Sequence, residues 1–301
     1  MSSWFALLIF PGFLYALPMG WLMLWLERKI LARLQSRIGP PFFQPFFDFV
    51  KLMSKEPIPR AKGEDIFYLL IPLLALGATL GSLMLLPILV SSSSAVGDLV
   101  LFIALIEVAP IGLVLLGFFS RSIFGQVGAI REATLTIASN LPFITALIAL
   151  AYASGSLRLS EIAANAPSVV RAFALLALLF CLPIKLRLNP FSVANAEQEI
   201  YQGALTELDG WRLGLWELVH AVEWVALSGL IVTLALPWRS GIAFLDAMVF
   251  ALLSLVLVVI LTVVAGATAR LKLLQASRLY WRWGFGLALL ALVVSFFPFG
   301  G

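Results

Sequence analysis

Residues 66–97 read IFYLLIPLLALGATLGSLMLLPILVSSSSAVG and contain no charged side chain. A helix needs about 20 apolar residues to cross the hydrocarbon of a bilayer, so this run is long enough to span it. Uncharged runs of similar length recur at residues 1–26, 133–157, 247–269 and 283–301. Three further apolar segments, 99–120, 169–184 and 213–238, contain ionisable residues. The apolar runs are continuous rather than alternating, which favours helices over a β-barrel.

The composition indicates that lipid is the solvent of this chain. Hydrophobic residues make up 62% of the 301 residues and charged residues 12%, with a mean hydropathy of +1.05. Soluble domains contain about 25% charged residues. We therefore predict an all-α membrane protein, a single transmembrane domain over residues 1–301, with about eight transmembrane helices plus a cytoplasmic amphipathic interfacial helix. The predicted spans are about 4–26, 66–90, 99–120, 133–153, 169–184, 213–237, 245–267 and 283–299.

The N-terminal apolar run is expected to be a membrane span rather than a cleaved signal. No basic residue precedes it, it exceeds the roughly 7–15 apolar residues of a signal peptide, and Glu27, Arg28 and Lys29 end it. The chain has one cysteine, Cys181, and one histidine, so no disulfide framework or metal cluster is predicted. Any iron–sulfur chemistry is expected in a partner subunit.

The basic residues indicate the orientation of the chain in the membrane. Seventeen of the 20 fall in four loops, 27–65, 121–132, 185–212 and 270–282, which alternate with the predicted spans and so share one side. Only Arg158, Arg171 and Arg239 belong to the other side. The positive-inside rule makes the basic side cytoplasmic and places both termini outside. We predict a multi-pass protein of the cell (cytoplasmic, or inner) membrane with its main loops in the cytoplasm.

The segment between residues 42 and 55 is typical of a helix that lies in the membrane interface. Its polar residues are Gln44, Asp48, Lys51 and Lys55, whose spacings of four, three and four form one narrow stripe on an apolar helix. The helix can be a simple anchor, or it can floor a cavity or receive a soluble partner.

Acidic residues are the candidates for function. A charged residue in the middle of a membrane helix costs roughly 2.5–3.5 kcal/mol on insertion scales, so such groups normally face the protein interior. Glu107 lies at the centre of its predicted span. In the predicted span 213–237, Glu217, His220 and Glu223 lie along one side of the helix. Such a file can pass protons or bind small cations, although Glu217 and Glu223 could instead pair with Arg212 or with another helix end. The acidic group singled out here comprises Glu107, Glu197, Glu199, Glu207, Asp209, Glu217 and Glu223, with His220 among them.

Several classes of enzyme are excluded by missing motifs. The sequence contains no GxxxxGK[ST] or GxGxxG loop for phosphates and no GxSxG nucleophile elbow. We predict no catalytic residue and no metal site in this chain.

Several motifs closely resemble subunit 1 of respiratory complex I, the H subunit in bacteria. They are ERKILARLQSRIGP at 27–40, DFVKLMSKE at 48–56, GSLRLSEI at 155–162, NPF at 189–191, EQE at 197–199, ELDG at 207–210 and RLK at 270–272. Within that family, the short segment GPPFFQP at 39–45 resembles the corresponding segment of the membrane subunit of energy-converting membrane-bound hydrogenases, of the group 4 nickel–iron type.

The resemblance implies a non-catalytic subunit that joins a peripheral redox arm to antiporter-like, ion-pumping and small membrane subunits. It implies iron–sulfur clusters, and a nickel–iron centre, in partner subunits. No nucleic-acid partner is predicted, because the basic residues are placed as markers of one membrane side. It also implies that the acidic residues above line a path from the redox cavity. One departure is Asn140, which stands where the family usually has a glutamate, so the path would be altered or use Glu132. The residues expected to dock the redox arm are Arg28, Arg33, Arg37, Gly39, Pro40, Asp48 and Lys51.

Two alternatives remain open from the sequence. The chain could be the H subunit of a quinone-reducing, NADH dehydrogenase-like complex, which a bound quinone would favour. It could also be an independent ion transporter, a class in which internal repeats are common. The sequence shows no such repeat.

Overall fold

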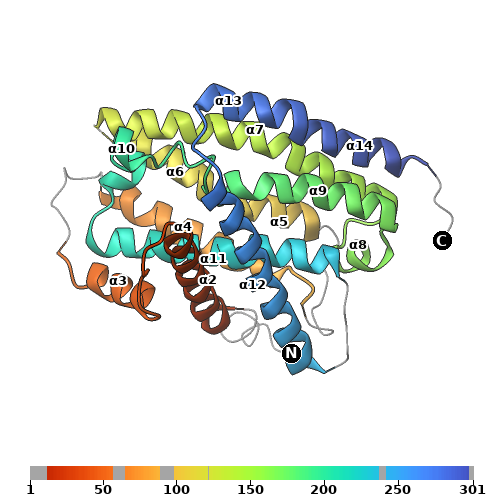
Figure 1. Ribbon diagram of the computed structural model, residues 1–301, viewed down its shortest axis with the longest axis horizontal. Coiled ribbons are helices and arrows are strands. Elements are labelled where there is room, and N and C mark those ends of the chain that lie inside the picture. Colours follow the sequence, from red (N-terminus) through yellow and green to blue (C-terminus); the bar gives the residue numbers. More distant parts are fainter. Residues whose placement is uncertain (1–11, 57–64, 89–97, 121, 237–241, 298–301) are drawn as a thin grey trace.

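The computed structural model describes residues 12–56, 65–88, 98–120, 122–236 and 242–297. The secondary structure of these residues is helical (Figure 1). In chain order the elements are α2 (Phe13–Leu34), α3 (Gln44–Met53), α4 (Asp65–Met84), α5 (Asp98–Ile106), α6 (Val108–Phe119), α7 (Ile123–Ser154), α8 (Leu159–Asn165), α9 (Ser168–Lys185), α10 (Glu197–Ile200), the 3-10 turn η1 (Gly203–Glu207), α11 (Gly210–Ala235), α12 (Ala243–Ala267), α13 (Leu273–Leu279), the π turn η2 (Tyr280–Gly284) and α14 (Phe285–Ser295).

The predicted class, an all-α membrane protein, is confirmed. Six helical segments in the described residues are long and apolar enough to cross a membrane: α4, the joined α5 and α6, α7, α9, α11 and α12. The other two predicted spans fall on α2, whose predicted first residues lie outside the described part, and on the η2–α14 segment. The count of about eight is therefore approximate.

Helix α11 forms the centre of the bundle. It packs against α2, α3, α4, α9 and α12, and 89% of its most apolar 18-residue window is buried, against 33% for α12. Most of its side chains therefore meet protein. Of the ionisable residues of α11, Arg212 and Glu223 are buried and Glu217 and His220 are half-buried, so partners in the protein can compensate their charge.

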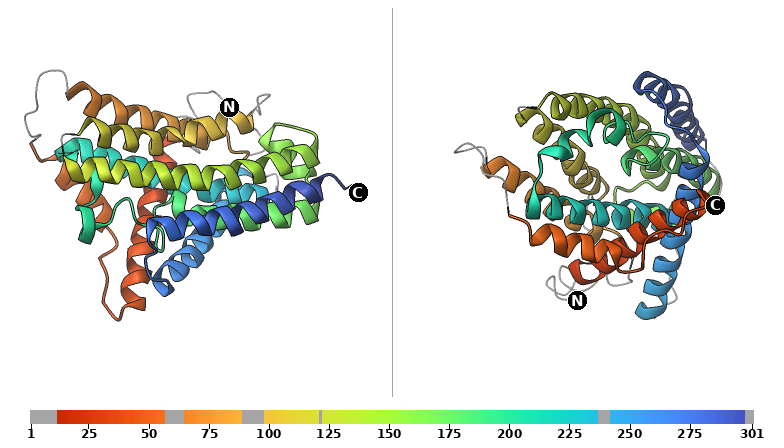
Figure 2. Two further views of the ribbon diagram at one scale, coloured as in Figure 1. Left: turned by 90° about the horizontal axis from the view of Figure 1, so that it is seen from above. Right: turned by 60° about the vertical axis from the view of Figure 1, so that its left-hand side comes forward.

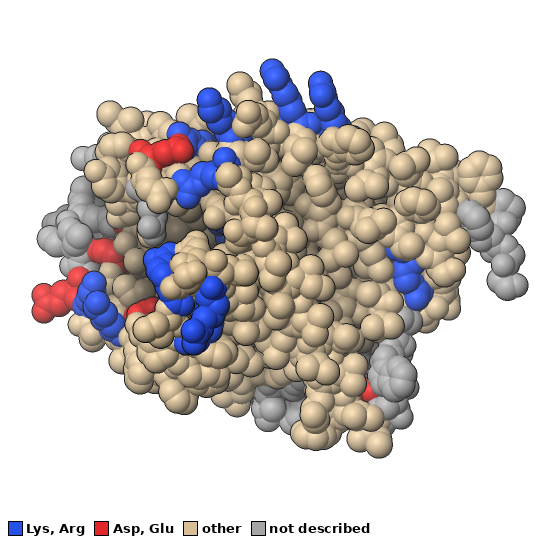
Figure 3. Space-filling view, viewed as in Figure 1, with Lys and Arg blue, Asp and Glu red and all other residues tan. Residues whose placement is uncertain are grey.

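The long helices α4, α7, α9, α11 and α14 run nearly side by side, whereas α2 and α12 cross the bundle obliquely (Figures 1 and 2). One end of the bundle carries α3, α10 and the first turns of α4, α7 and α11. The opposite end carries α8 and the C-terminal part of α14 (Figure 1). In the face that Figure 3 shows, most charged side chains gather toward the end with α3 and along the top edge. On this face, charge is thus unevenly divided between the two ends, as the loop composition predicts.

The turn before α3 is fixed by glycine and by hydrogen bonds to one carbonyl. Gly39 has φ +76°, a left-handed conformation that glycine adopts without strain. Trp25 Nε1 and Lys29 Nζ then donate to the Pro40 carbonyl at 3.4 and 3.3 Å. Helix α3 follows as the sequence predicts, with Gln44 bonded to Asp48 on its polar stripe and phenylalanines such as Phe43 and Phe47 exposed.

Candidate functional site

The end of α9 places two basic side chains in the protein interior. The helix closes in a Schellman motif, in which Leu188 N–H donates to Pro183 C=O at 2.7 Å and Arg187 N–H donates to Ile184 C=O at 3.0 Å. Arg187 occupies the position that usually holds glycine and has φ +57°. The chain reverses there, and Lys185 and Arg187 then reach two different sets of partners.

The Glu107 cluster consists of Glu107, Asn140 and Lys185, from three helical segments. Lys185 Nζ donates to Glu107 Oε1 and to Asn140 Oδ1, while Asn140 Nδ2 donates to Glu107 Oε2 at 2.8 Å. The ammonium also lies 4.7 Å from the centroid of the Phe143 ring. The three side chains form a closed ring with one negative and one positive charge, so this cluster is neutral.

Glu107 lies where α5 and α6 meet. Pro110 follows three residues later and has no N–H to donate to the carbonyl four residues before it, which explains the interruption between the two helices. The sequence prediction of an inward-facing carboxylate in this span agrees with the burial of Glu107.

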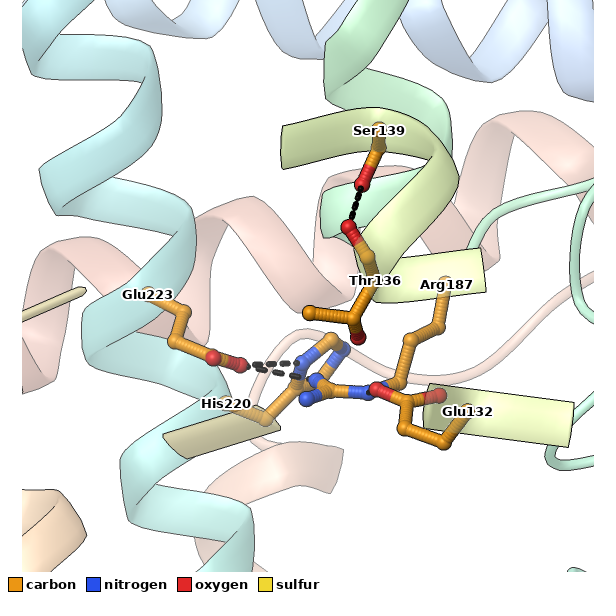
Figure 4. Close-up of polar contacts among 6 residues, drawn as sticks. All are labelled: Glu132, Thr136, Ser139, Arg187, His220 and Glu223. Atoms are coloured by element: carbon orange, nitrogen blue, oxygen red, sulfur yellow. Dashed lines mark hydrogen bonds and ion pairs between the residues drawn. The ribbon is translucent and has the colours of Figure 1, made fainter. Parts of the chain in front are cut away.

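The Glu223 cluster consists of Glu132, Arg187, His220 and Glu223 (Figure 4). The Arg187 guanidinium lies between the two carboxylates, with Nε 3.1 Å from Glu132 Oε1 and Nη1 2.8 Å from Glu223 Oε2. His220 Nδ1 is 3.5 Å from the same Glu223 oxygen. The side chains of Glu132, Arg187 and Glu223 are 7%, 7% and 3% exposed.

Charge in the Glu223 cluster is not balanced. Burial lowers the pKa of Arg187, but Glu223 and Glu132 more than offset this and hold that pKa above its usual value, so Arg187 stays charged. Two carboxylates therefore share one fixed positive charge, and His220 is neutral unless it is protonated. Counted as ionised, the two carboxylates exceed the guanidinium by one negative charge, which one proton on either carboxylate would neutralise.

A small cavity lies between the two clusters. It has a volume of about 20 Å³, and its polar lining residues are Glu132, Thr136, Ser139, Lys185 and Glu223. A cavity holds a water molecule when it offers about 10–15 Å³ and two to four polar partners, and this one meets both conditions. Lys185 contributes to the lining and to the Glu107 cluster.

Beyond His220, the acidic residues continue toward the end of the bundle with α3. Glu27 on α2 interacts electrostatically with His220 and Glu217. Asp209 precedes α11 and lies 3.1 Å from Arg212, so Arg212 pairs with Asp209 rather than with Glu217 or Glu223.

The predicted loop carboxylates lie at this same end. Glu199 is half-exposed and lies 2.6 Å from Arg131. Glu207 ends η1 and is half-buried, and Glu197 begins α10. Of the predicted pathway, the structure thus joins His220 and Glu223 directly, whereas Glu107 lies in a separate cluster across the cavity.

The predicted docking residues divide into two groups. Gly39 and Pro40 build the turn before α3, and Arg28 pairs with Asp48 at 2.9 Å, so these four connect α2 to α3. The other three, Arg33, Arg37 and Lys51, have exposed side chains at that end.

The roles of Lys185, Arg187 and Glu27 do not follow from the sequence. In the sequence, Lys185 and Arg187 are counted among the basic loop residues that predict the cytoplasmic side. A charge count cannot distinguish a loop arginine in water from one that is folded into the bundle. From the sequence, Glu132 is considered only as a replacement for the glutamate that the family usually has where this chain has Asn140. No group of three or more His, Cys, Asp and Glu residues in the described part of the chain is placed to hold a metal ion.

Several known proteins are similar to this chain over most of its length. The family model described as NADH dehydrogenase matches residues 6–296. Hydrogenase-4 component C of Escherichia coli is 33% identical, over 89% of this chain and 89% of the relative. Formate hydrogenlyase subunit 4 of the same organism is 29% identical, over 89% and 91%. The H subunit of the NADH-quinone oxidoreductase of Dehalococcoides mccartyi is 28% identical, over 92% and 81%.

A solved structure has the same fold. A chain of the membrane-bound sulfane sulfur reductase, an archaeal respiratory membrane complex, superposes with a TM-score of 0.86 at 25% identity, covering 94% of this chain and 96% of that one. These relatives are subunits of multisubunit membrane complexes. The chain belongs to the NADH dehydrogenase family of membrane subunits, which includes the H subunit of complex I and its hydrogenase counterparts.

Proposed function

We propose that this chain connects a peripheral redox arm to ion-pumping subunits in a proton- or sodium-translocating membrane-bound complex of the hydrogenase type. The observation that carries the proposal is the file of charged groups inside the bundle. It runs from Glu217 and Glu27 through His220 and the Glu223 cluster to the cavity and Glu107. Buried charges are costly, and pairing alone would not require a surplus carboxylate.

The position of the file supports a coupling role. Its first members lie toward the end with α3, where exposed Arg33, Arg37 and Lys51 offer charge to a partner. A redox arm docked there would meet the acidic path at its entrance. Iron–sulfur clusters and a nickel–iron centre would then belong to that arm, with antiporter-like and small membrane subunits beside the bundle.

The substitution Glu223→Gln tests the path. Glutamine keeps the shape of the side chain and can still accept a hydrogen bond from Arg187, but it cannot carry a proton. We expect the complex to assemble and its peripheral redox reaction with an artificial electron carrier to persist. Ion transport into inverted vesicles and coupled turnover should fall by roughly tenfold or more, which corresponds to about 1.4 kcal/mol in a rate-limiting barrier.

Glu161→Gln is the matched control, because Glu161 pairs with Arg158 at the opposite end of the bundle. It should leave transport unchanged. Normal transport by an intact Glu223→Gln complex would remove Glu223 from the path, and loss of assembly would instead indicate a structural role. Identification of the co-purifying polypeptides tests the kind of complex: nickel and iron–sulfur subunits support the hydrogenase type, and extracted quinone supports the quinone-reducing alternative.

A further inference from the structure

Lys185 belongs to two sets of neighbours at once. Its ammonium donates to Glu107 and to Asn140, and its side chain lines the cavity that Glu132 and Glu223 also line. An ammonium has three N–H donors, and the Glu107 cluster uses two of them, so one remains for another acceptor such as a water molecule. Lys185 therefore lies at the junction of the Glu107 and Glu223 clusters.

Asn140 determines the chemistry of this junction. Its amide group donates to Glu107 and accepts from Lys185, so it holds both charged groups while contributing no charge or titratable proton. A carboxylate in its place would give the ring a net charge of −1. With the amide, the Glu107 cluster is neutral and its exchangeable protons are those of Lys185 and Glu107.

From this geometry we propose that Lys185 is the group that carries a proton between the two clusters, through one water molecule held in the cavity. The proposal rests on the proposed ion path and adds a specific carrier to it. Lys185 releases one proton to the water, which passes one proton to Glu132 or Glu223 of the cluster with surplus negative charge. The neutral amine then takes the proton that Glu107 has received from its own side of the path, and Glu107 returns to the carboxylate. One proton has then crossed, and the starting charges of Lys185, the water and Glu107 are restored.

Burial and packing confine the Lys185 ammonium to the space between the Glu107 side and the cavity. The Lys185 side chain is 6% exposed, and the Phe143 ring lies against its charge. Lysine ends α9, and its long, flexible stem allows a shift between the Glu107 side and the cavity without moving the helix. Asn140 is the positioning residue that defines the Glu107 side of this movement.

The substitution Lys185→Arg separates a proton carrier from a structural charge. Arginine keeps the positive charge beside Glu107 but does not release its proton in proteins. We expect an assembled complex whose peripheral redox reaction is retained and whose proton transport into inverted vesicles falls by roughly tenfold or more. The matched control is Lys272→Arg, because Lys272 is exposed outside the bundle interior, and it should transport protons normally. Normal transport by Lys185→Arg would overturn the proposal, since charge alone would then suffice at this position.

Two further variants keep the test decisive if arginine does not fit. The double variant Lys185→Met with Glu107→Gln leaves no buried charge unpaired in the ring, and we expect it to assemble and to lose proton transport. Ser139→Val fills the cavity without touching the ion pairs, and should also lower transport. Normal transport by the double variant would overturn the role of Lys185 as the carrier. Normal transport by Ser139→Val would overturn the role of the water molecule in the cavity. If Glu223→Gln is impaired while Lys185→Arg is normal, only this inference fails; if Glu223→Gln is also normal, the proposed path itself fails.

Discussion

At the scale of single residues, Arg187 combines a backbone cost with an electrostatic gain. A residue other than glycine in the left-handed region costs roughly 1–2 kcal/mol. The guanidinium offsets this by pairing with Glu132 and Glu223, which are both buried. The backbone conformation is what turns the side chain into the bundle, so strain and charge compensation arise from the same residue.

Substitution of Arg187 separates these two contributions. Arg187→Gly removes the backbone strain but leaves two buried carboxylates without a counter-charge, a loss of roughly 3–5 kcal/mol. We therefore expect Arg187→Gly to lower the temperature at which the purified complex dissociates. Arg187→Ala should lower that temperature further, because alanine keeps the backbone strain, which costs about 1 kcal/mol of stability. Adding Glu132→Gln to Arg187→Gly should restore part of the loss. A glycine variant more stable than the parent would show that the ion pairs contribute less than the strain.

At the scale of helices, the close approach of α2 and α11 depends on Gly20. A Cβ atom at this position would lie 2.4 Å from the Ala221 carbonyl oxygen, a distance that real Cβ contacts do not reach. Ala221 follows His220 on α11, so this contact also fixes the part of the helix that carries the Glu223 cluster. Small residues let membrane helices approach each other closely, as here.

Gly20→Ala should force α2 and α11 apart. We expect a loss of roughly 1–3 kcal/mol in stability, the usual cost of overpacking, and a parallel loss of coupled turnover because His220 and Glu223 would move. The control is Gly77→Ala on α4, where an added Cβ meets no atom within 4 Å of this chain. In a helix, alanine in place of glycine should stabilise by about 0.5–1 kcal/mol. Thermal stability of the two complexes in detergent compares them, and equal shifts would contradict the packing argument.

The helices also show which parts of the fold the sequence can predict. The predicted span 169–184 lies within α9, because hydropathy reports apolar length directly. The predicted fourth span starts at residue 133, whereas the helix that contains it, α7, already begins at Ile123. The prediction excluded charged Glu132 from the span, yet Glu132 lies within α7. Its charge is tolerated there because Arg187 pairs with it inside the protein. The pairing of Lys185 with Glu107 joins residues 78 positions apart, and no local pattern encodes it.

At the scale of the whole molecule, the distribution of charge underlies both the predicted orientation and the proposed function. The end with α3 and α10 holds the described parts of three predicted basic loops, residues 35–56, 122–132 and 186–209, and it is also where the acidic file begins. If the basic loops are cytoplasmic, as the positive-inside rule predicts, the entrance of the file lies on the cytoplasmic side, where the proposed redox arm would dock.

Cysteine labelling tests this orientation. The native Cys181 is fully buried in α9, and replacing it with alanine gives a background free of reactive thiols. Arg278→Cys, on α13, and Asn165→Cys, at the end of α8, then place single exposed thiols on the predicted cytoplasmic and outer sides. A membrane-impermeant maleimide should label Asn165→Cys in whole cells and Arg278→Cys only in inverted vesicles, because basic loops stay on the cytoplasmic side during insertion. Denatured samples should label at both positions, which controls for thiols covered by partner subunits. The reverse pattern would turn the molecule over in the membrane, and the acidic file would then open away from any cytoplasmic redox arm, which would contradict the proposed function as well.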